Sequence, residues 1–127
     1  MSFAYWCVLI AAVLPYLWVA IAKARPGYNN RNPRAWANRS DNHFVQRAYA
    51  AHLNAFENFA PFAAGVVLAQ LAGVAAPTVN TLAGTFVLLR IVHGLLYIGD
   101  QPTLRSLSWL GGFACTAALI VLAALQA

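Results

Sequence analysis

The sequence places a cation, an imidazole and a phenol at helical spacing within an otherwise apolar stretch. Arg90, His93 and Tyr97 follow an i, i+3, i+7 pattern, which puts all three on one face of a helix with Gly94 between them. A charge at the centre of a membrane helix costs about 2.5–3.5 kcal/mol on insertion scales, so it needs a partner or a wet cavity. The stripe indicates either a functional site or a set of interhelical hydrogen bonds.

A second polar stripe precedes the first in the chain. Arg47, Asn54 and Asn58 lie within roughly 40° of one another on a helix, and Glu57 lies near the edge of this stripe. His52 points about 140° away from Arg47, so we expect it to contact another element. Two matched stripes with two arginines and a carboxylate favour a functional site over simple interhelical contacts.

The two stripes lie at matching depths when residues are counted at about 1.5 Å each from the turn near Pro77. Glu57 and Arg90 then lie within one helical turn of each other, and Asn54 lies level with Tyr97. We predict that Glu57 and Arg90 pair, because each charge would otherwise be unpaired in hydrocarbon. The same count predicts a polar cleft close to one membrane surface.

The stripes require long helices, and the composition indicates that these helices lie in a membrane. Of the 127 residues, 61% are hydrophobic and 9% are charged, against about 25% charged in an ordinary soluble chain. Crossing about 30 Å of hydrocarbon takes roughly 20 apolar residues. We predict an all-α integral membrane four-helix bundle in one domain, 1–127, with spans at about 3–22, 44–72, 79–98 and 106–126. Residues 75–80 are predicted to break the central apolar run, and residues 23–43 to form a loop.

Five of the eight basic residues lie in the 23–43 loop, which the positive-inside rule places in the cytoplasm. The 99–105 loop and the polar cleft then also face the cytoplasm, and both termini lie on the other side. Orientation is a sufficient reason for the net charge of +5, so we predict no nucleic-acid partner, although these cations could also hold anionic headgroups or an anionic substrate. Cys7, Cys115 and the histidines are too dispersed to predict a metal site.

The polar motifs also resemble a known family. The segments RAYAAHLNAFENFAPF (47–62), RIVHGLLY (90–97) and DQPTLRSLSW (100–109) are similar to the membrane-associated proteins in eicosanoid and glutathione metabolism, the MAPEG family. The patterns Ala-His-x-Asn-x-x-Glu-Asn-x-x-Pro and Arg-x-x-His-x-x-x-Tyr are fairly specific together, and the resemblance covers most of the chain. It implies a four-helix subunit of a homotrimer that binds glutathione between neighbouring subunits from the cytosolic side.

The resemblance assigns roles to individual residues. In enzymatic members an arginine at the cytosolic start of the fourth helix stabilises the glutathione thiolate, and Arg105, followed by Ser106, stands in that place. A cation beside a thiol lowers its pKa, and a helix N-terminus adds partial positive charge. The implied catalytic residues are Arg105 and Ser106, and the implied glutathione-binding residues are Arg47, Asn54, Glu57, Arg90, His93 and Tyr97.

The implied activity is that of a microsomal glutathione transferase or peroxidase, with glutathione as co-substrate and a hydrophobic small molecule or lipid as its second partner. Eicosanoid-synthesising relatives carry further arginines on the second helix, where this chain has Ala50 and Leu53, and Trp109 replaces a tyrosine found in some members. These differences argue against leukotriene or prostaglandin synthesis. The alternatives are a non-catalytic lipid-binding or scaffold protein of the same family, and a small transporter built on Glu57 and Arg90.

The basic residues also carry a compositional hint about source. Arginine greatly outnumbers lysine, of which Lys23 is the single example, and alanine is abundant. This usage favours a GC-rich bacterium, which would place the multi-pass protein in the inner membrane.

Overall fold

The chain folds into four long helices joined by two tight turns and one longer connection, which contains a short fifth helix. The computed structural model describes residues 2–127, and its elements are α1 (Ser2–Lys23), α2 (Pro33–Arg39), α3 (His43–Leu71), α4 (Ala76–Ile98) and α5 (Pro102–Gln126). These residues contain no strand, which confirms the all-α prediction. Three of the helices, α1, α4 and α5, are long and apolar enough to cross a membrane. The longest helix, α3, carries Arg47 and Glu57 among its apolar residues.

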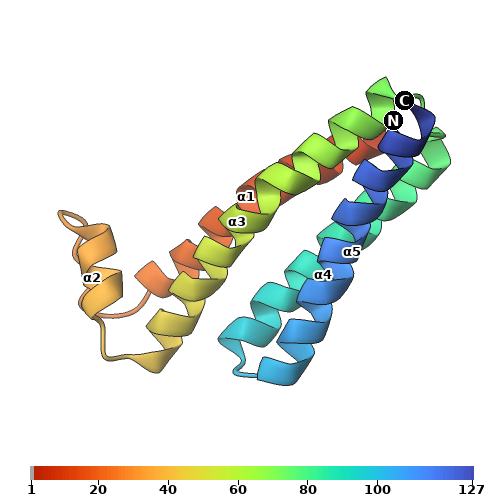
Figure 1. The fold of residues 1–127 in the computed structure, drawn as a ribbon. Coiled ribbons are helices and arrows are strands. Elements are labelled where there is room, and N and C mark those ends of the chain that lie inside the picture. The colour runs from red at the N-terminus through yellow and green to blue at the C-terminus, as the bar shows by residue number, and fades with distance from the viewer. Residues whose placement is uncertain (1) are drawn as a thin grey trace.

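The long helices run beside one another as two pairs, and the two ends of the molecule differ (Figure 1). The termini and the α3–α4 turn lie at one end, whereas α2 and the α4–α5 turn lie at the other. Helix α1 packs chiefly against α3, and α4 against α5, while α3 contacts both α4 and α5, and α1 contacts α4, between the two pairs. The connection between α1 and α3 and the turn at 99–101 therefore lie at the same end of the helices, and residues 102–105, predicted as part of a loop, form the first turn of α5.

The tight turns after α3 and α4 use left-handed residues. Gly73 has a φ of 82°, and its N–H donates to the carbonyl of Gln70 (3.1 Å) while the N–H of Val74 donates to the carbonyl of Ala69 (2.9 Å). These bonds satisfy carbonyls that the end of a helix leaves without a partner. Asp100 takes the same conformation after α4, with a φ of 59°. Each turn thereby reverses the chain within a few residues.

Two predicted boundaries are corrected by the structure. The break between the second and third long helices lies at 72–75 rather than 75–80, because Pro77 stands in the first turn of α4, where a missing N–H has no intrahelical partner to lose. The sequence predicts the 23–43 segment as loop throughout, but it contains α2. Trp36 of this short helix packs against Ala22 and Val45, at the ends of α1 and α3.

Aromatic rings fill the core between the long helices. Phe62 of α3 and Phe86 of α4 stack with centroids 3.8 Å apart and planes 5° apart, and both are fully buried. Closer to the α4–α5 turn, the indole of Trp18 from α1 lies directly against Gly94 of α4. Small residues at such positions let two helices approach closely. The absence of a side chain at Gly94 therefore determines how closely α1 approaches α4.

Replacing Gly94 with alanine should destabilise the protein, because the added Cβ would overlap the indole ring of Trp18. Overpacking a filled core costs about 1–3 kcal/mol, so we expect a lower midpoint of thermal unfolding in mild detergent. The matched control is Gly112→Ala in α5, where the nearest atom to an added Cβ is Cδ of Arg90 at 3.5 Å, an ordinary contact. Equal midpoints for the two variants would contradict the close packing of α1 on α4.

Candidate functional site

A polar hollow of about 260 Å³ opens between α3, α4 and α5, at the end of the molecule that carries the α4–α5 turn. It brings together five of the eight residues that the sequence singles out, together with one further aromatic residue. Asn54 and Tyr97 border the same space, as the depth count predicts. The residues that line it are Asn54, His93, Tyr97, Arg105, Ser106 and Trp109.

The hollow is built on a hydrogen-bond network between α3 and α4. Nη2 of Arg90 donates to Oδ1 of Asn54 at 2.7 Å, and Nδ2 of Asn58 donates to the same oxygen at 3.2 Å and to the Asn54 carbonyl at 2.9 Å. An amide oxygen has two acceptor positions, and both are used here. The NH₂ group of Asn54 is therefore left as a donor beside the hollow.

The predicted ion pair between Glu57 and Arg90 is wrong. No hydrogen bond or ion pair joins the two side chains within residues 2–127, and Glu57 is exposed, whereas Arg90 is 4% exposed and bonded to Asn54. The depth count matched the two charges along the helix axis but ignored rotation about it. Glu57 lies at the edge of the α3 stripe, so Asn54, one turn earlier, is the residue that faces α4.

Arg105 is held at the rim of the hollow by the aromatic ring of Tyr97. It lies in the first turn of α5, and its guanidinium carbon is 4.3 Å from the centroid of the Tyr97 ring, within the range of a cation–π interaction. The Tyr97 ring in turn meets His93 edge-on, with centroids 5.7 Å apart. None of the lining residues is acidic. A fixed cation without a carboxylate beside it suits an anionic ligand.

Two buried polar atoms near the hollow have no hydrogen-bond partner among the described residues. They are Nδ1 of His93, whose side chain is 2% exposed, and Nη1 of Arg90. Buried polar groups are normally paired, because an unpaired one costs about 1–3 kcal/mol. Such atoms next to a polar hollow indicate that a ligand or water completes their hydrogen bonding.

Arg47 does not line the hollow. Its Nε donates to the carbonyl of Ile98 at 3.1 Å, in the last turn of α4. That carbonyl has no partner within the helix, and a cation near a helix C-terminus is favourable. Within a single chain Arg47 therefore joins the start of α3 to the end of α4.

His52 contacts another helix, as predicted from its angle on α3. Its Nδ1 lies 2.7 Å from the carbonyl of Pro15 in α1. The imidazole also stacks on Tyr49 and meets Phe56 edge-on. His52 therefore serves the packing of α1 on α3 and takes no part in the hollow.

Trp109 also lines the hollow, although the family resemblance points to it only as the replacement for a tyrosine found in some members. It follows Arg105 by four residues, and i, i+4 neighbours share a helix face, so spacing alone would have placed it in the hollow. Its ring stacks on Phe113 with centroids 5.3 Å apart. The indole forms an aromatic wall beside the Arg105 cation.

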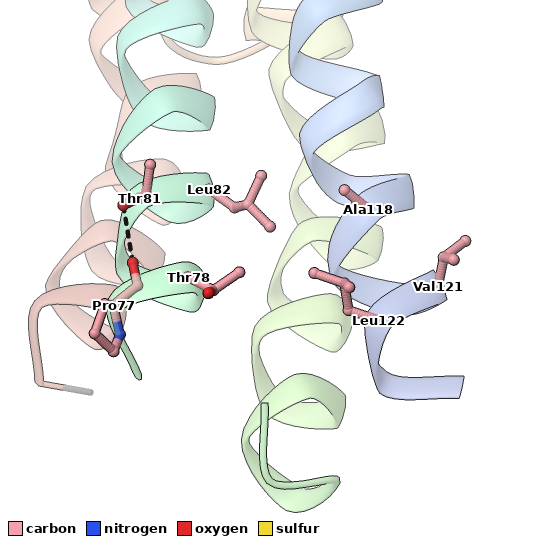
Figure 2. A pocket seen from close by; sticks show the side chains of 7 residues that line it. All are labelled: Pro77, Thr78, Thr81, Leu82, Ala118, Val121 and Leu122. Carbon is pink, nitrogen blue, oxygen red and sulfur yellow. Dashed lines mark hydrogen bonds between the residues drawn. The ribbon is translucent and has the colours of Figure 1, made fainter. Parts of the chain in front are cut away.

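A larger hollow of about 580 Å³ lies between α4 and α5 near the chain termini, away from these groups (Figure 2). Figure 2 shows Thr78 and Leu82 of α4 facing Ala118 and Leu122 of α5. The hydroxyl of Thr81 donates to a carbonyl of its own helix at 2.8 Å, so it is already satisfied. This apolar hollow contains no ionisable group, and the polar hollow is therefore the candidate site.

Asn54→Ala should lower the free energy of unfolding by about 1.5–3 kcal/mol, the usual contribution of a hydrogen bond to a charged group. The substitution leaves the guanidinium of Arg90 buried without its acceptor. Asn58→Ala is the matched control, since the hydrogen bonds that it removes lie within α3. Unfolding by denaturant in mixed micelles measures both losses. An equal loss for the two variants would contradict a role of Asn54 in joining α3 to α4.

Comparison with protein-family models gives a match to the MAPEG family over residues 3–125. The matched range contains every residue that lines the polar hollow. No curated protein and no solved structure matches the chain. Since the match covers nearly the whole sequence and α1, α4 and α5 can cross a membrane, this protein is an integral membrane protein of the MAPEG family, which is associated with glutathione and eicosanoid metabolism.

Proposed function

We propose that this protein is a membrane-bound glutathione transferase or peroxidase that activates the glutathione thiol for attack on a hydrophobic electrophile. The observation that carries the proposal is Arg105, a cation held over the Tyr97 ring in a hollow without acidic residues. A cation next to a thiol stabilises the thiolate, which is the nucleophile. Arg105 also lies in the first turn of α5, where the helix N-terminus adds partial positive charge.

The chemistry of the hollow fits glutathione, which is a net anion with one ammonium group. The NH₂ group of Asn54 and Nη1 of Arg90 are donors suited to carboxylate and peptide oxygens. The hydroxyl of Ser106 lies beside Arg105 and can donate a second hydrogen bond to the thiolate. Glu57 of α3 does not line the hollow, but its exposed carboxylate suits the ammonium group of a tripeptide that extends beyond the hollow.

In the transferase reaction the thiol first loses its proton to water, with the remaining negative charge stabilised by Arg105. The sulfur then forms a bond to the electrophilic carbon, and the leaving group departs with the electrons of the broken bond. An apolar electrophile would reach the site through the bilayer, because α1, α4 and α5 are long and apolar enough to cross it. The chain's own residues need only bind the tripeptide and hold the thiolate.

Glutathione is proposed to bind between subunits of a homotrimer. The hollow of about 260 Å³ is smaller than the roughly 300–1,000 Å³ of ordinary ligand pockets, which supports a site whose walls are completed by a neighbouring subunit. Helix α3 packs along α1, α4 and α5, which supports its assignment as a fourth span and a four-helix subunit. The positive-inside rule supports a cytoplasmic location for 23–43 and 99–105, and the composition supports a bacterial inner membrane.

Purified protein mixed with glutathione should show the ultraviolet absorbance of the thiolate at neutral pH, and Arg105→Gln should lose it. A cation favours the charged form of the thiol, so the pKa of bound glutathione falls below the ordinary thiol value of about 8.5. In Arg105→Gln the thiolate should appear only as the pH rises towards that value. Arg34→Gln is the matched control, because it removes an equal charge from an exposed position outside the hollow.

A non-catalytic lipid-binding or scaffold protein of the same family is the second candidate. The observation that favours it is Leu53, which is 44% exposed at a position where eicosanoid-synthesising relatives carry an arginine. This candidate predicts a bound lipid that survives purification and ligand binding that Arg105→Gln leaves unchanged. A thiolate signal that is absent from the unsubstituted protein would exclude the enzymatic proposal and favour this one.

Native mass spectrometry in mild detergent should show a homotrimer, because the small hollow of a single chain leaves part of a bound tripeptide uncovered. Adding glutathione should increase the trimer's resistance to dissociation, since a ligand held between subunits stabilises the assembled form. The control is the same titration on Arg105→Gln, in which the thiolate interaction is missing. A monomer that still forms the thiolate would contradict an inter-subunit site.

A further inference from the structure

The connection between α1 and α3 is a folded element that the proposed reaction does not use. We call residues 23–43 the basic segment. Its short helix α2 is docked by Trp36, which packs on Ala22 of α1 and Val45 of α3. The segment is joined to the start of α3 by Asn42. The side chain of Asn42 accepts hydrogen bonds from the N–H groups of Phe44 (2.9 Å) and Val45 (3.4 Å). Its side chains are therefore held in place at the end of the long helices.

Three arginines of the basic segment project from it without a partner. Asp41 is its one acidic residue, and no side-chain hydrogen bond of Arg31, Arg34 or Arg39 is found within residues 2–127. All three are exposed. We call them the outer arginines.

The two cations nearer to α1 are already engaged by aromatic rings. Nζ of Lys23 lies 5.3 Å from the centroid of Tyr28, and the guanidinium carbon of Arg25 lies 3.8 Å from the centroid of Phe44. These contacts hold Lys23 against the segment itself and Arg25 against the first turn of α3. The outer arginines are thus the ones with their charge available to a ligand.

One outer arginine borders a hollow of about 470 Å³ on α2, built from hydrogen-bonding side chains and an indole. Guanidinium, amide and hydroxyl groups are the donors that phosphate oxygens accept, and arginine can donate two parallel bonds to a phosphate. A tryptophan ring is typical of the headgroup level of a membrane. The lining residues are Asn29, Asn32, Ala35, Trp36, Arg39 and Ser40.

The position of the basic segment indicates that the phosphate it binds belongs to a lipid headgroup. It begins at the last residue of α1, which is apolar enough to cross a membrane, and Trp36 fastens it to the ends of α1 and α3. The segment therefore lies where the lipid headgroups are. The positive-inside rule accounts for the number of cations here, but it requires neither a folded segment nor a hollow.

We propose that the basic segment binds the headgroups of anionic phospholipids of the surrounding membrane, with the outer arginines and the hollow beside Arg39 as the binding surface. This surface shares no residue with the polar hollow between α3, α4 and α5. Clustered cations next to a membrane helix are attracted by anionic lipids, with a gain of roughly fivefold in affinity for each charge. The binding is independent of whether the protein is an enzyme.

The test uses the full chain in mild detergent, mixed with equal amounts of dioleoyl phosphatidylglycerol and dioleoyl phosphatidylcholine. Native mass spectrometry should show that the bound lipid is enriched in phosphatidylglycerol. The triple variant Arg31→Gln, Arg34→Gln, Arg39→Gln should lose this enrichment, by roughly fivefold for each charge removed. The matched variant with lysine at the three positions keeps the charge and should keep most of the enrichment.

Three outcomes would overturn the proposal. They are equal recovery of the two lipids by the unsubstituted protein, unchanged enrichment in the glutamine variant, and displacement of phosphatidylglycerol by inorganic phosphate at constant ionic strength. The last result would identify a site for free anions instead of lipid. The glutamine variant should keep its thermal unfolding midpoint, because the outer arginines are exposed and make no side-chain hydrogen bond within residues 2–127. The enrichment of bound lipid therefore tests lipid binding alone, and the thiolate absorbance tests the glutathione proposal separately.

Discussion

The structure depends on how the guanidinium of Arg90 is satisfied inside a helix that can cross a membrane. It is 4% exposed, and hydrocarbon offers no water to replace a missing partner. The hydrogen bond to Asn54 meets that need and joins α4 to α3. On the other side, the stem of Arg90 lies next to Gly112 of α5. One buried cation therefore brings together the three helices that form the polar hollow.

The same interaction prepares the hollow for a ligand. Because Asn54 accepts from both Arg90 and Asn58, its amide orientation is determined and its NH₂ group remains a donor. Arg105 reaches the hollow from α5 and is held over Tyr97 of α4. The donors thus stand on rigid helices before any ligand binds, and such preorganisation reduces the entropy lost on binding.

Much of the fold is predictable from the sequence, because apolar runs and polar stripes are local properties of a helix. The all-α class, the long helices and the level at which Asn54 meets Tyr97 all follow from composition and a rise of about 1.5 Å per residue. The short helix α2 does not follow from local sequence, because it is stabilised by tertiary contacts of Trp36 and by the burial of Ala37. The break lies earlier in the chain than predicted, because Pro77 stands in the first turn of α4, where proline is favoured.

The sequence by itself determined which residues share a helix face and how deep each lies, because both follow from the geometry of one helix. Only the tertiary structure decided how each helix is rotated towards its neighbours. That rotation depends on packing between distant residues, such as Trp18 against Gly94, and it turns Asn54 rather than Glu57 towards Arg90. The depth of a residue adds up along its own helix, whereas the rotation of a helix results from all its contacts with other helices. The sequence therefore predicted which residues lie near the hollow better than which side chains they bind.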